Sequence, residues 1–140
     1  MAVIISTRPL DDAMIDAAVL AEHHIKCLPA PMMTINPMAI DLNQCRNDIP
    51  ADAVALTSRH AVAMITGTAW ANAPIYCVGE STARLARDMG LTDIISGPGD
   101  GDGLIKIIAN SPHRHIFWPS AVDVGFDLVK PLTAHGVHVT

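Results

Sequence analysis

The segment IYCVGESTARLARDMG, residues 75–90, joins a short apolar run to a glycine and then to an amphipathic stretch. The apolar run is rich in residues that favour strands, and Gly79 can adopt backbone angles that other residues avoid. A helix is predicted to follow, with Ser81 or Thr82 capping its first N–H groups and Gly90 just past its end. The start of such a helix attracts carboxylates and phosphates, because its N–H groups are unpaired.

Apolar runs and amphipathic segments alternate along the whole chain. The predicted strands are residues 2–6, 25–28, 53–57, 75–78, 94–96, 116–118 and 137–139. The predicted helices are residues 11–24, 59–65, 80–89, 104–110 and 124–135, and residues 38–46 fit either a helix or a loop. Such alternation is typical of a parallel sheet with helices on both faces. The predicted fold class is therefore α/β, a parallel-sheet flavodoxin-like or Rossmann-like domain preceded by a β-α unit that belongs to a second, incomplete lobe.

Three prolines, Pro29, Pro31 and Pro37, interrupt this pattern and favour an extended crossing segment. The predicted organisation is a first β-α unit of an incomplete lobe in residues 1–31, a linker in residues 32–37, and an α/β domain in residues 38–140. A lone β-α unit cannot bury its apolar face. Either the chain is a fragment, or its first unit packs on another chain, in which case self-association is expected.

Composition excludes several classes of protein. Half of the 140 residues are hydrophobic and 16% are charged, which is typical of a folded domain. The net charge of −5 argues against non-specific nucleic-acid binding. Three cysteines without CxxC spacing predict reduced thiols in the cytoplasm. No apolar run approaches the roughly 20 residues of a membrane-spanning helix, so no membrane partner is expected.

Neither a cofactor nor a metal is predicted. The glycine-rich loop GPGDGDG, residues 97–103, fits neither the dinucleotide-binding motif nor a P-loop, and it lacks the later ligands of a calcium loop. The histidines share no zinc-site spacing with cysteine or aspartate. A solvated turn that caps the following helix is the simpler interpretation of the loop.

Several motifs in their order along the chain resemble uroporphyrinogen-III synthase. They are TRP at residues 7–9, the proline-rich crossing, TSRHAV at 57–62, VGESTA at 78–83 with Gly90, and the segment 128–136. The resemblance implies a bilobed enzyme whose first lobe is built from both ends of the chain. This sequence would then supply about the first half of the family's length, and the tyrosine that the family has near the return strand would fall after Thr140.

The resemblance also implies an activity. Family members convert the linear tetrapyrrole hydroxymethylbilane, a polycarboxylate, to uroporphyrinogen III without a cofactor. The substrate-binding residues that the resemblance implies lie within these motifs and are Arg8, Ser58, Arg59, Gly79, Ser81 and Thr82. The sequence departs from the family pattern after residue 118, where no basic residue precedes Lys130.

Other interpretations of these residues stay open. Arg8 can simply pair with Asp11 or Asp12, Thr82 can be a helix cap, and Arg59 can be a solvated surface charge. A non-catalytic anion-binding or regulatory α/β module derived from this fold is the alternative function.

Overall fold

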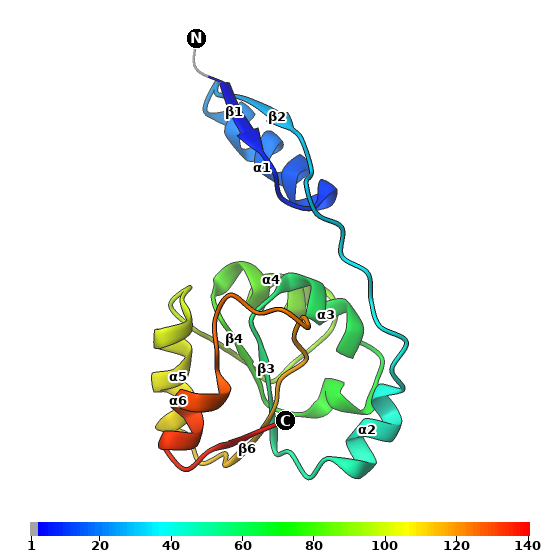
Figure 1. Ribbon diagram of the computed structural model, residues 1–140, viewed down its shortest axis with the longest axis vertical. Coiled ribbons are helices and arrows are strands. Elements are labelled where there is room, and N and C mark those ends of the chain that lie inside the picture. The colour runs from blue at the N-terminus through cyan, green and yellow to red at the C-terminus, as the bar shows by residue number, and fades with distance from the viewer. Residues whose placement is uncertain (1–2) are drawn as a thin grey trace. The chain divides into compact units, whose positions relative to one another are not determined.

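The computed structural model describes residues 3–140. The chain divides into two compact units, Met1–Ala39 and Ile40–Thr140, and each is described by itself (Figure 1).

The first unit is a β-α-β arrangement. Its elements are β1 (Val3–Ser6), α1 (Leu10–Glu22) and β2 (Lys26–Pro29). The two strands are parallel, with Ile4 opposite Cys27. Ala2, the first residue of the predicted strand, lies outside the described residues.

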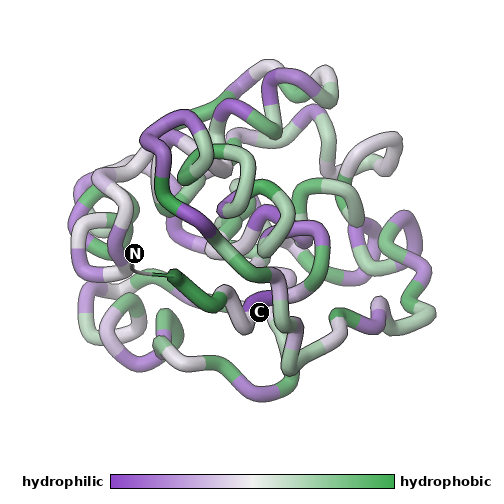
Figure 2. The backbone as a smooth tube through the Cα atoms, turned by 90° about the horizontal axis from the view of Figure 1, so that it is seen from above, coloured by the Kyte–Doolittle hydropathy of each residue, from purple (hydrophilic) through white to green (hydrophobic). Residues whose placement is uncertain are grey.

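The expectation of a buried first strand is wrong within this unit. Val3, Ile4 and Ile5 are all exposed, by 49%, 42% and 60%. Figure 2 shows the hydrophobic colour of this segment beside the N label. The reason is that one helix covers only one face of a two-stranded sheet, and the apolar residues on α1 are also largely exposed. The unit contains too few layers to bury the apolar side chains that its sequence carries.

The second unit contains a five-stranded parallel sheet. Its strands are β3 (Ala53–Leu56), β4 (Ile75–Cys77), β5 (Ile94–Ser96), β6 (His115–Phe117) and β7 (His138–Val139). Its helices are α2 (Leu42–Asp48), α3 (Arg59–Ile65), the 3-10 helix η1 (Ala69–Asn72), α4 (Glu80–Asp88), α5 (Gly101–Ala109) and α6 (Val129–Ala134). The strand order is β5-β4-β3-β6-β7, and every pair is parallel. The predicted α/β class is confirmed.

Helices cover both faces of this sheet (Figure 1). On one face, α3 and α4 pack on a core that contains Val54, Leu56 and Trp70. On the other face, α5 and α6 pack on a second core that contains Tyr76 and Ile116. β3 is buried throughout, because it lies at the centre of the sheet with helices on both sides.

The starts of α5 and α6 differ from the predicted ones, each for a local reason. α5 begins at Gly101 rather than residue 104, because the Asp100 carboxylate accepts a hydrogen bond from the Gly103 N–H at 2.7 Å and so caps the helix earlier. α6 begins at Val129 rather than residue 124. Asp127 accepts a hydrogen bond from the Val129 N–H at 2.8 Å, which fixes that later start. The connection between β6 and α6 is therefore a long loop.

Candidate functional site

The carboxyl ends of β3 and β4 lie side by side at one edge of the second sheet. The strands are parallel, with Leu56 opposite Cys77. The turn after β3 contains Ser58, and the turn after β4 contains Gly79. Ligands of open parallel sheets bind at this edge.

Gly79 occupies the N-cap position of α4. Its carbonyl accepts a hydrogen bond from the Ala83 N–H at 3.1 Å, as expected for a residue that begins a helix. Among residues 3–140, no side chain caps this helix. The expectation that Ser81 or Thr82 is the cap is therefore wrong, because both lie inside the first turn. The N–H groups of that turn remain without a side-chain partner.

The turn after β5 packs closely against Gly79. The Gly99 N–H donates to the Val78 carbonyl at 2.8 Å, and the Gly97 N–H donates to the Cys77 carbonyl at 2.8 Å. A Cβ added at Gly79 would lie 2.8 Å from the Gly99 Cα, a separation that real Cβ atoms essentially never show. The start of α4 is thus held against a neighbouring turn by backbone contacts.

The two hydroxyl residues of the first turn differ in exposure. Ser81 is exposed, whereas Thr82 is only 6% exposed. Within residues 3–140, the Thr82 hydroxyl forms no hydrogen bond with another residue. A hydroxyl that forms no internal hydrogen bond can bind a ligand without giving one up.

The turn after β3 is capped by its own serine. The Ser58 hydroxyl accepts a hydrogen bond from the His60 N–H at 3.2 Å, so it already satisfies one donor of α3. Arg59 is the first residue of that helix and is partly buried. It therefore follows β3 at the same edge of the sheet as the α4 start.

One acidic side chain lies in the first turn of α4. Glu80 accepts a hydrogen bond from Arg87 at 2.8 Å, and both side chains are exposed. This bond is the main reason that the pKa of Glu80 lies below its usual range. The ionised carboxylate partly neutralises Arg87 and makes the α4 start less positive than a bare helix terminus would be.

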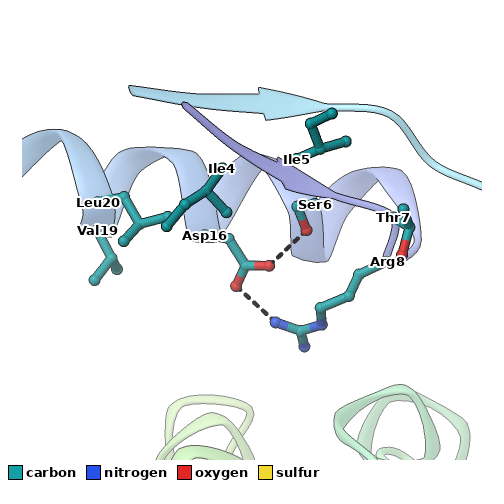
Figure 3. Close-up of a pocket in the computed structure, with 8 residues that line it drawn as sticks. All are labelled: Ile4, Ile5, Ser6, Thr7, Arg8, Asp16, Val19 and Leu20. Atoms are coloured by element: carbon teal, nitrogen blue, oxygen red, sulfur yellow. Dashed lines mark hydrogen bonds and ion pairs between the residues drawn. The ribbon is translucent and has the colours of Figure 1, made fainter. Parts of the chain in front are cut away.

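Arg8 belongs to the first unit, where it pairs with carboxylates. Its guanidinium lies 3.2 Å from the Asp12 carboxylate. It also lies 2.6 Å from Asp16, which accepts a hydrogen bond from the Ser6 hydroxyl at 2.8 Å (Figure 3). Asp12 is one of the two partners that the sequence suggests for Arg8. The other five predicted residues share one edge of the second sheet.

The sequence interpretation missed a contact between two neighbouring strands. The indole N–H of Trp118, directly after β6, donates to the Thr57 hydroxyl, directly after β3, at 3.0 Å. Trp118 is predicted to end a strand, and only the observed strand order puts it beside Thr57.

Two classes of site receive no support from the part of the chain that the structure describes. Residues 3–140 contain no group of three or more histidine, cysteine, aspartate or glutamate side chains arranged to hold a metal ion. No helix among these residues has both the length and the apolar character needed to cross a membrane.

Comparisons with known proteins identify the family. A solved structure with the same fold is uroporphyrinogen III synthase from the extremely thermophilic bacterium Thermus thermophilus, with a TM-score of 0.52 and 15% sequence identity. The match covers 99% of this chain and 59% of that chain. A comparison with curated proteins gave no match. The family model of uroporphyrinogen-III synthase HemD matches residues 16–140. The chain therefore belongs to the uroporphyrinogen-III synthase HemD family.

Proposed function

We propose that this chain acts as a uroporphyrinogen-III synthase, converting hydroxymethylbilane to uroporphyrinogen III. The observation that carries the proposal is the family match over residues 16–140. The chain spans 59% of the length of the solved enzyme whose fold it shares. The match favours this enzymatic function over a non-catalytic anion-binding module.

The proposed reaction removes one water molecule and inverts the last pyrrole ring. Protonation of the terminal hydroxyl lets it leave as water and gives an electrophilic azafulvene cation. The substituted carbon of the last ring attacks it to form a spiro intermediate, which fragments and recloses with that ring reversed. One proton is released in return from the last ring when the final closure restores that pyrrole. The substrate supplies all the electrons, so no redox cofactor is needed. The protein must hold a flexible polycarboxylate in the reactive fold and stabilise developing charge.

The α4 start is the proposed carboxylate-binding element. Its first-turn N–H groups have no side-chain cap among the described residues, and the Thr82 hydroxyl in that turn forms no internal hydrogen bond. Ser81 and Gly79 complete this surface, with Ser58 and Arg59 at the neighbouring turn. Arg8 is proposed as a further substrate contact, and binding there would compete with its two carboxylate partners.

The isomer distribution of the product tests the activity. The protein is incubated with freshly generated hydroxymethylbilane, and the uroporphyrinogen isomers are oxidised and separated. Isomer III above the level of a protein-free control is expected, because spontaneous closure gives isomer I. Isomer I alone would overturn the proposal for this chain.

Thr82→Val provides a matched test of the proposed carboxylate site. The substitution keeps the side-chain volume and removes a hydroxyl that has no internal partner, so the free energy of unfolding should change by less than about 0.5 kcal/mol. A lost hydrogen bond to a charged group costs about 1.5–3 kcal/mol, which corresponds to roughly ten- to a hundred-fold weaker substrate binding. Unchanged affinity for a tetrapyrrole polycarboxylate would exclude Thr82 from the site.

Self-association is proposed for the first unit. The support is the exposed apolar surface of β1 together with a hollow of about 460 Å³, which Ile4, Val19 and Leu20 help to line (Figure 3). Packing of this surface against a second copy would remove apolar area from water. Sedimentation analysis should show a mass that rises with concentration, and a monomer mass at all concentrations would count against it.

A cytoplasmic location is proposed from the state of the thiols. Cys27, Cys45 and Cys77 are all free in the structure, which suits a reducing compartment. Fractionation of cells that produce the tagged protein should recover it with cytosolic markers.

A further inference from the structure

The hydrogen bond between Trp118 and Thr57 lies where the strand order of the second sheet reverses. β3 pairs with β4 on one side and with β6 on the other. The chain leaves β3 for α3 on one face of the sheet, and it leaves β6 for α6 on the opposite face. At such a point the two connections diverge, and doubly wound sheets bind their ligands there.

Trp118 is held in place at this point by two bonds. Its indole N–H donates to the Thr57 hydroxyl at 3.0 Å, and its backbone N–H donates to the Thr140 carbonyl at 2.8 Å. The side chain packs against the core on the α5 and α6 face, yet it is only partly buried. Trp118 therefore keeps accessible surface at the edge of the sheet where the carboxyl ends of the strands lie.

The other tryptophan of the chain has a different environment. Trp70 is fully buried and stacks on Phe117 with a ring-centroid separation of 4.2 Å. Arg46 lies over its ring at 4.6 Å from the centroid, and its indole N–H donates to the Leu42 carbonyl at 2.9 Å. The whole side chain of Trp70 is thus used in packing the core, whereas the accessible surface of Trp118 packs against no other residue.

We propose that the accessible surface of Trp118 contacts a pyrrole ring of the ligand and makes this edge selective for carboxylated pyrroles over ring-free polycarboxylates. The proposal rests on the proposed function for the class of ligand. Aromatic side chains bind flat rings by offset or edge-to-face contact. The start of α4, at the same edge of the sheet, supplies carboxylate contacts that a ring-free acid can also use. The ring contact is what distinguishes the two kinds of ligand.

Two-dimensional ¹H–¹⁵N NMR of the full chain tests the contact directly, because each indole N–H gives its own signal. The probe is porphobilinogen, a monopyrrole with one acetate and one propionate side chain, and citrate is the ring-free comparison. Porphobilinogen should shift the Trp118 indole signal in a saturable way and leave the Trp70 signal in place. Citrate should shift backbone amides of the α4 start with little change at Trp118. A Trp118 signal that does not move with porphobilinogen overturns the proposal.

Two substitutions separate the ring contact from packing. Trp118→Phe keeps an aromatic ring, while Trp118→Leu removes it and keeps an apolar side chain. Porphobilinogen affinity should fall roughly two- to ten-fold in the leucine variant and should stay close to the parent value in the phenylalanine variant. Citrate affinity should be equal in the two variants. Equal porphobilinogen affinity in the two variants would contradict the proposal.

The two failures are distinguishable. Shifts at the α4 amides with porphobilinogen, without any change at Trp118, would leave the proposed function standing and remove the ring contact. If neither set of signals responds and only isomer I forms from hydroxymethylbilane, the proposed function fails together with the inference.

Discussion

Gly79→Ala should destabilise the second unit measurably, although the residue has an ordinary extended backbone. Its φ is −162°, a value that alanine adopts without strain. The difficulty is space, since the new Cβ would lie 2.8 Å from the Gly99 Cα and 3.2 Å from the Gly99 nitrogen. Carbon atoms in contact lie about 3.5–4.0 Å apart, so one turn must move by roughly 0.7 Å or more.

The expected cost follows from that displacement. Overpacking a tight contact costs about 1–3 kcal/mol, and replacing glycine returns about 0.4–1 kcal/mol by restricting the unfolded chain. The net loss in free energy of unfolding is therefore at most about 2.6 kcal/mol and centres on about 1.3 kcal/mol. Because the moved turns belong to the proposed carboxylate site, tetrapyrrole affinity should fall as well.

Gly125→Ala is the matched control. A Cβ at Gly125 would meet no atom within 4 Å, and its backbone is not in the left-handed region. Urea unfolding followed by circular dichroism should give a midpoint lower by roughly 0.7–1.3 M in Gly79→Ala than in Gly125→Ala, given a slope of about 1–2 kcal/mol per M. Equal midpoints would refute the argument that close backbone packing at Gly79 holds the two turns together.

Local structure leads to three further expectations. His24 follows α1 with a φ of 57°, a left-handed backbone angle that glycine adopts more easily than histidine. His24→Gly should therefore stabilise the first unit by about 1 kcal/mol and slow amide hydrogen exchange in α1; unchanged exchange would contradict this. Burial and the adjacent His138 hold the pKa of His115 below its ordinary value of 6.5. The free energy of unfolding should therefore fall as the pH drops from about 7.5 to about 5.5, and it should fall less in His138→Gln; equal falls in the two proteins would exclude an effect of His138 on His115. Burial raises the pKa of Cys77 to about 11, so at about pH 8 a thiol reagent should label only the other two cysteines before unfolding; rapid labelling of Cys77 would refute its burial.

Much of the second unit was predictable because its elements are local in sequence. The helix Arg59–Ile65 and the strand Ile94–Ser96 follow from short apolar runs between turn residues, and the structure has both at the predicted bounds. The late start of α6 was not predictable in this way. Residues 124–128 are apolar enough to extend the helix, but the Asp127 carboxylate accepts a hydrogen bond from the Val129 N–H and Phe126 packs against Gly101.

The candidate site was predictable only in part. Turns after parallel strands share an edge, so Ser58 and Gly79 could be expected on the same side of the sheet. The predicted capping of α4 is wrong, because a glycine at the N-cap leaves Thr82 inside the first turn of the helix. The contact between Trp118 and Thr57 joins residues 61 apart in sequence, and no local pattern encodes the strand order that brings them together.

The central claim is that the start of α4 binds the carboxylates of a tetrapyrrole. The backbone N–H signals of Glu80, Ser81 and Thr82 report on this most directly, in an NMR titration of the full chain with uroporphyrinogen III. We expect these three signals to shift together and to saturate, and the shifts to shrink in the Thr82→Val variant. Signals that stay fixed while uroporphyrinogen binds elsewhere on the chain would contradict the account.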